Sequence, residues 1–170
     1  MFQIYYGMGK GKTSALNGAA LRAFGAELKV KVYRFLKGRH SHENQVLEKV
    51  GIEVEMFHYG QKFVIQMNDE ERKKAKLIAF EGMQKIIQDQ HKYDVIIIDE
   101  FLDLMDETVN FCKQNDILSF IEKINKDKEI IVSGHSKYDK VFDKADLISY
   151  INPERHYFNK GVSARKGFEY

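Results

Sequence analysis

The chain contains very little cysteine and proline, and no tryptophan. Among its 170 residues, Cys112 is the single cysteine and Pro153 the single proline. One cysteine cannot form a disulfide within the chain, so a small scaffold held by internal disulfides is excluded and a reducing compartment is expected. Cys112 ends a short apolar stretch, 109–112, and we expect it to be a buried small hydrophobic residue. No apolar run approaches the length that crosses a bilayer, so no membrane partner is expected.

The chain has only a small excess of positive charge over negative charge. The 27 basic and 25 acidic residues leave a net charge of +2, which argues against a general nucleic-acid-binding surface. Any polyanion site must therefore be local. Met1 leads directly into an apolar run with neither a basic leader nor a cleavage site, and we expect the protein in the cytoplasm.

The composition, 44% hydrophobic and 31% charged, is that of a single globular domain over residues 1–170. Short β-branched or apolar runs alternate with segments of helical spacing, which predicts an α/β fold with a mostly parallel sheet of about six strands between layers of helices. The expected strands are 2–6, 30–36, 52–57, 95–98, 130–132 and 147–151. Helices are expected over 14–24, after the N-cap Asn68, and over 116–125.

The strongest motif is a glycine-rich loop between the first strand and the first helix. Its amides and the helix N-terminus can face a polyphosphate, Lys12 can reach the terminal phosphates, and the Thr13 hydroxyl can ligate Mg²⁺. Tyr6 stands where the common phosphate-loop pattern has its first glycine, and an unliganded glycine-rich turn is the alternative. The residues expected to bind ATP are Gly7, Met8, Gly9, Lys10, Gly11, Lys12, Thr13 and Ser14. The fold is thus expected to be P-loop NTPase-like, of the RecA-like type.

A second motif, Asp99-Glu100, follows four consecutive aliphatic residues. Ligands collect at the carboxyl ends of parallel strands, so these carboxylates are expected beside the bound nucleotide. One can hold Mg²⁺, and the other can ligate metal or orient a nucleophile.

Three other features have weaker signals. Phe63 lies in an expected loop, 58–66, and burial tendencies favour it as a core residue over a ligand contact. His40 and His42 are expected to be solvent-exposed in one loop, without metal-ligand spacing. The segment 153–170 is basic, glycine-punctuated and aromatic, which favours a packed lid or substrate wall over a frayed terminus.

The order of these segments resembles that of the bacterial P-loop ATP:corrinoid adenosyltransferases over nearly the whole chain. The resemblance is carried by the loop G-x-G-K-G-K-T, by Asp99-Glu100, and by the segments 34–38, 133–134 and 145–146. It is carried above all by the ending H-x-F-x-x-G-V-x-A-R-x-G-F-E-Y over 156–170. The family's loop also lacks the first glycine, which accounts for Tyr6.

The resemblance implies transfer of the 5′-deoxyadenosyl group of ATP to a Co(I) corrinoid, with release of triphosphate. Lys10, Lys12 and a Mg²⁺ held by Thr13 and Glu100 would stabilise the leaving group, and Asp99 would support the metal. The implied partners are ATP, the corrinoid and an electron-donating flavoprotein reductase, and the implied oligomer is a homodimer.

The resemblance also implies contacts of Phe63, Ile65, His135 and Phe158 with the corrinoid or the nucleoside. Phe63 would pack near the lower face of the corrin, where an apolar wall favours four-coordinate cobalt. Ile65 replaces a common family tryptophan, His135 a usual arginine and Leu102 a usually polar residue.

Two other functions remain open from the sequence. One is a small P-loop ATPase, in which Glu100 activates water for attack on the γ-phosphate. The other is a corrinoid- or nucleotide-binding paralogue without turnover, which the residues Ile65 and His135 motivate.

Overall fold

The computed structural model describes residues 1–37, 41–57, 59–60 and 62–168. It is built on one six-stranded, all-parallel sheet in the order β3-β2-β4-β5-β1-β6. The strands are β1 (Phe2–Tyr6), β2 (Val30–Arg34), β3 (Glu53–Met56), β4 (Val95–Asp99), β5 (Glu129–Gly134) and β6 (Leu147–Tyr150). All six predicted strands are confirmed, and no strand end shifts by more than two residues. Gly38, His40, Glu169 and Tyr170, named above, lie outside the described residues.

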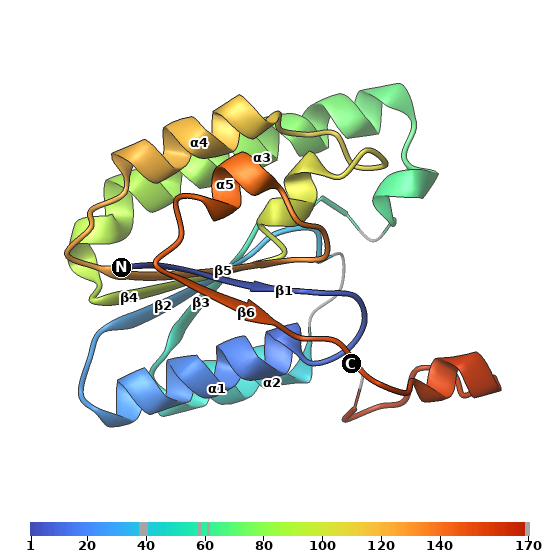
Figure 1. Ribbon diagram of the computed structural model, residues 1–170, viewed down its shortest axis with the longest axis horizontal. Helices are drawn as coiled ribbons and strands as arrows, with labels where there is room; N and C mark the ends of the chain where they lie inside the picture. Colours follow the sequence, from blue (N-terminus) through green and yellow to red (C-terminus); the bar gives the residue numbers. More distant parts are fainter. Residues whose placement is uncertain (38–40, 58, 61, 169–170) are drawn as a thin grey trace.

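Helices cover both faces of this sheet (Figure 1). One face carries α1 (Lys12–Gly25) and α2 (His42–Val50), and the other carries α3 (Asp69–Asp89), α4 (Gln114–Lys123) and the short α5 (Asp139–Phe142). Single 3₁₀ turns lie at η1 (Val64–Gln66), η2 (Gln90–Lys92), η3 (Leu102–Met105) and η4 (Tyr157–Lys160). The predicted three-layer α/β fold is confirmed.

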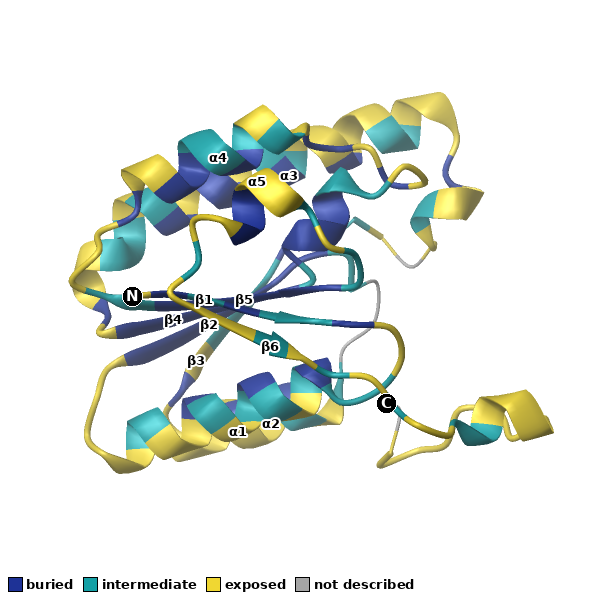
Figure 2. Cartoon of the chain, viewed as in Figure 1, coloured by how far each residue is buried: buried dark blue, intermediate teal, exposed yellow. Residues whose placement is uncertain are grey.

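The central strand β4 explains why the sheet needs helices on both sides. All five of its residues are buried. Ile96 and Ile98 belong to the core beneath α3 and α4, whereas Val95 and Ile97 belong to the core beneath α1 and α2. Because successive side chains of a strand point to opposite faces, an unbroken aliphatic run requires two apolar layers. Figure 2 shows the central strands buried and the edge strand β6 largely exposed.

Helix α3 begins where the sequence predicts. The Asn68 side chain accepts a hydrogen bond from the Glu71 amide at 2.9 Å, and the Glu71 carboxylate accepts one from the Asn68 amide at 2.9 Å. This reciprocal pair satisfies two amides that the helix leaves free. One face of this helix is apolar and points to the core, with Ala75, Ala79, Gly82, Met83 and Ile86 buried.

Two expectations for loops are wrong. His42 is exposed, as expected, but it is the first residue of α2 and does not lie in a loop. Gly51, in the left-handed conformation (φ 103°), follows the last residue of this helix. The apolar pair Val46-Leu47 and the terminal glycine were the available signals for this helix. Phe63 is 69% exposed and precedes η1, so it is not a core residue. The prediction for Cys112 is confirmed, since it is 2% exposed in the core beneath α3.

Candidate active site

The glycine-rich loop joins β1 to α1 at the carboxyl edge of the sheet (Figure 1). Gly7, Gly9 and Gly11 all have positive φ angles, of 138°, 84° and 123°. A Cβ atom on Gly7 would lie 2.0 Å from the Ile151 carbonyl oxygen, so the loop passes too close to the segment after β6 for any side chain. The loop therefore requires glycine, and it delivers the N-terminus of α1 to the carboxyl edge.

Lys12 is the first residue of α1, and its side chain folds back into this loop. Its side chain is buried, and Nζ donates hydrogen bonds to the carbonyl oxygens of Gly7 at 2.6 Å and Gly9 at 3.0 Å. Burial lowers the pKa of Lys12, while the nearby carboxylates of Asp103 and Asp99 favour the charged form. Among the described residues, this ammonium bonds to backbone carbonyls alone and contacts no anion, so it can transfer to an incoming phosphate.

Asp99, at the end of β4, is the centre of a buried polar network. Its Oδ2 accepts hydrogen bonds from Thr13 Oγ1 at 3.0 Å and Arg34 at 2.8 Å and lies 2.9 Å from Lys37 Nζ, while Oδ1 accepts from Ser133 at 2.7 Å. Burial alone would raise the pKa of Asp99, but the Lys37 and Arg34 charges outweigh it and hold the pKa at about 2. Asp99 is therefore ionised and fully paired.

The strand order explains this convergence. Arg34 of β2 is the register partner of Asp99 on β4, and Ser133 lies on β5, the other neighbour of β4. The three residues come from distant parts of the chain, and parallel pairing brings them to one edge. Arg34 and Ser133 lie in the segments 34–38 and 133–134 that carry the family resemblance, but nothing local in the sequence shows that they meet at Asp99.

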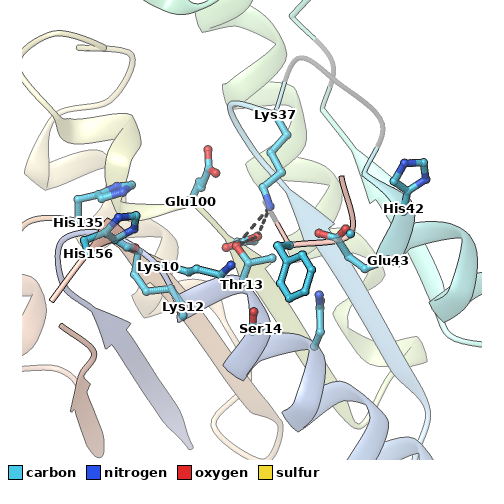
Figure 3. A pocket seen from close by; sticks show the side chains of 16 residues that line it. Lys10, Lys12, Thr13, Ser14, Lys37, His42, Glu43, Glu100, His135 and His156 are labelled. Atoms are coloured by element: carbon cyan, nitrogen blue, oxygen red, sulfur yellow. Dashed lines mark hydrogen bonds and ion pairs between the residues drawn. The ribbon is translucent and has the colours of Figure 1, made fainter. Parts of the chain in front are cut away.

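Glu100 follows Asp99 and adopts a positive φ of 59°. Its amide donates to Ser133 Oγ at 2.9 Å, and its side chain borders the cavity beside the loop (Figure 3). Burial, together with the neighbouring Asp99 charge, raises the pKa of Glu100 to about 7. Two adjacent carboxylates thus differ sharply in acidity, and only Glu100 can exchange a proton near neutral pH.

We expect Glu100→Gln to stabilise the nucleotide-free protein at pH 8. The raised pKa means that ionising Glu100 costs free energy in the folded state, up to about 3 kcal/mol. The cost is absent below the ordinary pKa near 4.5 and complete above pH 7. Urea unfolding should show a gain of about 1–3 kcal/mol at pH 8 and little difference at pH 4. Equal gains at both pH values would contradict the assignment.

His135 is held by Asp103, a residue for which the sequence carries no functional signal. Asp103 accepts a hydrogen bond from the His135 amide at 2.7 Å, and its other oxygen lies 2.9 Å from His135 Nδ1. This side-chain bond raises the pKa of His135 above its usual range. Asp103 follows Leu102 on η3 and had no recognisable spacing to the other site residues.

The C-terminal segment packs against Lys10. The Lys10 Nζ donates a hydrogen bond to the Tyr157 hydroxyl at 3.0 Å and lies 5.6 Å from the ring centres of Tyr157 and Phe168. The Arg165 guanidinium lies 4.7 Å from both of these rings. Cations and aromatic faces attract each other at such distances. The segment is therefore anchored to the phosphate loop, although most of it is exposed in Figure 2.

These groups surround a cavity of about 450 Å³, a volume typical of ligand sites. Its lining, seen in Figure 3, is Gly9, Lys10, Gly11, Lys12, Thr13, Ser14, Asn17, Lys37, His42, Glu43, Asp99, Glu100, His135, His156, Gly167 and Phe168. The cavity thus brings together most of the predicted ATP and metal residues with His135. Other predicted residues do not border it: Gly7, Met8, Phe63, Ile65 and Phe158, of which Ile65 and Phe158 are 81% and 71% exposed.

The donors at this cavity suit magnesium by type. Thr13 Oγ1 and Asp99 Oδ2 lie 3.0 Å apart, close to the spacing of about 2.9 Å between adjacent oxygens in an octahedron with Mg–O bonds of 2.0–2.1 Å. Among the described residues, no three His, Cys, Asp or Glu side chains converge as a metal cluster. A cation here would therefore need further oxygens from water or from phosphate.

A glycine loop that leads into α1 at the carboxyl edge of a parallel sheet, beside the buried Asp99 and the half-buried Glu100, defines a P-loop nucleotide-binding α/β protein. The model of the family described as ATP:corrinoid adenosyltransferase BtuR/CobO/CobP matches residues 1–170, and the chain belongs to that family. No helix in the described part of the chain is long and apolar enough to span a bilayer.

Curated relatives agree over nearly the full length. The chain is 27% identical to the corrinoid adenosyltransferase CobA of Salmonella typhimurium over 168 residues, which cover 98% of this chain and 84% of the relative. The corrinoid adenosyltransferase of Escherichia coli K12 gives the same identity and coverage. That of Pseudomonas aeruginosa is 25% identical over 98% of this chain and 82% of its own. The family and these names make the chain a transferase.

Proposed function

We propose that the protein transfers the 5′-deoxyadenosyl group of ATP to the Co(I) centre of a corrinoid, in cobalamin biosynthesis or salvage. The match of the family model to residues 1–170 carries this proposal. The cavity supports it, because it joins a phosphate loop to a space large enough for part of a nucleotide.

In this reaction cobalt supplies the electron pair. A Co–C bond forms at the ribose C5′, the C5′–O bond breaks, and its electron pair leaves with the triphosphate. The protein needs no nucleophile of its own; it must align the two substrates and stabilise the charge on the leaving group. We assign the second task to Lys10, Lys12 and the amides of the loop, with Ser14 at the first turn of α1.

We assign Mg²⁺ to Thr13, Asp99 and Glu100, whose oxygens are the donors this ion prefers. The bound ion would supply positive charge to the departing triphosphate. The chain's own contribution is to hold this region in place: Ser133 donates to Asp99 Oδ1 and accepts from the Glu100 amide, which ties the Asp99 carboxylate to the backbone at Glu100.

The corrinoid is assigned to the exposed aromatic and apolar side chains around the carboxyl edge. Phe63, Ile65 and Phe158 are candidates from the family resemblance, and all three are large apolar side chains that remain exposed and available for contact. His135 borders the cavity and is assigned to the nucleoside or corrinoid side. The tail, 153–170, would act as a lid or substrate wall over the loop, since it already contacts Lys10.

Phe63→Ala should impair use of the corrinoid without affecting the fold. At 69% exposure the ring contributes little to stability, and we expect a change in unfolding free energy within about 0.5 kcal/mol. Instead, the KM for corrinoid should rise, or the rate with Co(II) corrinoid and a reductase should fall. Leu77→Ala, a truncation at another exposed site, on α3, is the matched control. Identical kinetics for the two variants would remove Phe63 from the corrinoid site.

The proposed setting is cytoplasmic, with an electron-donating flavoprotein that keeps the corrinoid reduced and with a homodimer as the working form. Both partners follow from the family resemblance. A size measurement by light scattering, and reduction assays with purified flavoproteins, would test them separately.

The decisive experiment is anaerobic incubation with ATP, Mg²⁺ and chemically reduced corrinoid, followed by the spectral change of cobalt–carbon bond formation. We expect an adenosylated corrinoid and one triphosphate per turnover. ADP and orthophosphate without any need for corrinoid would instead identify an ATPase, in which Glu100 activates water. Tight binding of both substrates without a Co–C bond would identify a non-catalytic paralogue.

A further inference from the structure

Lys37 lies at the point where the predicted metal ligands meet. It follows β2 and lines the cavity. Its Nζ is 2.9 Å from Asp99 Oδ2 and donates to Thr13 Oγ1 at 3.3 Å, and these two oxygens are themselves 3.0 Å apart. Figure 3 shows the Lys37 side chain reaching across the cavity to this pair. The ammonium therefore shares two oxygens with the assigned Mg²⁺.

The charges around Asp99 strengthen the competition between the Lys37 ammonium and a divalent cation. Asp99 carries one negative charge, and it already contacts two cations, the Lys37 ammonium and the fully buried Arg34 guanidinium. A divalent cation on the same carboxylate would meet two positive charges at close range in a partly desolvated site. Arg34 cannot withdraw, because it has no exposed surface and its other terminal nitrogen donates to Asn17 Oδ1 at 2.8 Å. Lys37 is the cation that can leave, since its side chain is 17% exposed and its stem is flexible.

We propose that Lys37 is an internal counter-ion that occupies the divalent-cation position of the nucleotide-free site, so that the metal binds only together with a polyphosphate. The inference rests on the magnesium assignment in the proposed function. A nucleoside triphosphate brings enough negative charge to offset the metal, and its oxygens accept the ammonium that leaves Asp99. Lys37 then becomes a third cation on the polyphosphate, beside Lys10 and Lys12.

The test measures metal binding to the full chain without nucleotide, using Mn²⁺ and the loss of its free electron paramagnetic resonance signal. Lys37→Gln should bind Mn²⁺ at least about tenfold more tightly than the wild-type protein, because it removes the competing charge. Lys37→Arg keeps the charge and should still exclude the metal. Lys10→Gln is the matched control, since it removes a charge from the same cavity without touching Asp99.

Mn²⁺ binding by the wild-type protein with a non-hydrolysable ATP analogue tests the metal assignment separately from the counter-ion role of Lys37. If the analogue recruits Mn²⁺ but Lys37→Gln leaves nucleotide-free binding unchanged, the counter-ion role is wrong and the metal assignment stands. If neither the analogue nor the substitution brings Mn²⁺ to the protein, both are wrong. Equal gains in Lys10→Gln and Lys37→Gln would reduce the effect to general electrostatics and overturn the proposal. Urea unfolding of each variant confirms that it is folded.

Discussion

Lys12→Ala is expected to lower kcat/KM for adenosyl transfer by at least about 10²-fold while leaving the protein folded. The ammonium now rests on the carbonyls of Gly7 and Gly9, and a polyphosphate in the loop would replace these neutral acceptors with charged ones. The attraction between the Lys12 ammonium and the phosphate oxygens grows as negative charge accumulates on the leaving triphosphate. Removing the ammonium therefore weakens the transition state more than the ground state.

The fold should tolerate this change, although Lys12 is buried. Its desolvated charge is already costly, as the lowered pKa indicates, so the loss of two hydrogen bonds is partly offset. We expect a change in unfolding free energy of about 1 kcal/mol or less in urea. Lys137→Ala, at an exposed lysine paired with Asp139, is the control for kinetics. Undiminished turnover in Lys12→Ala would remove the loop from catalysis.

Asp99→Asn is expected to cause the largest loss of stability, about 3–5 kcal/mol at pH 7. The substitution leaves the Arg34 guanidinium, which has no exposed surface, without a negative charge. Asp99 has a depressed pKa, so its contribution is complete above the ordinary value near 3.8 and is lost as the pH falls towards 2. Urea unfolding at pH 7 and at pH 3 would measure both effects.

The neighbouring carboxylate provides the matched comparison. Glu100→Gln removes the same charge one residue away, but it should stabilise the protein at pH 8, because Glu100 has a raised pKa and no hydrogen-bonded cation among the described contacts. Opposite signs of the change in unfolding free energy for the two variants would establish that pairing with cations, and not burial alone, decides whether a carboxylate stabilises the fold. A neutral Asp99→Asn would mean that water or another group compensates Arg34.

Much of the fold could be predicted from local patterns. The aliphatic run before Asp99 predicts a central strand. Asn68 predicts where helix α3 begins, and the apolar stripe of that helix predicts which face is buried. Helix α2 was missed because its apolar stripe is short. Phe63 was misplaced because aromatic residues are usually buried, and nothing local shows that η1 lies at the surface.

The sequence by itself determined the phosphate loop, the alternation of strands and helices, and the family. Glycine positions, apolar periodicity and the C-terminal motif are local properties that need no knowledge of distant contacts. Only the tertiary structure decided that Arg34, Lys37 and Ser133 converge on Asp99, and that the C-terminal aromatics pack on Lys10. The reason is topological. The strand order places β4 between β2 and β5, and side chains far apart in the chain meet only after those strands pair.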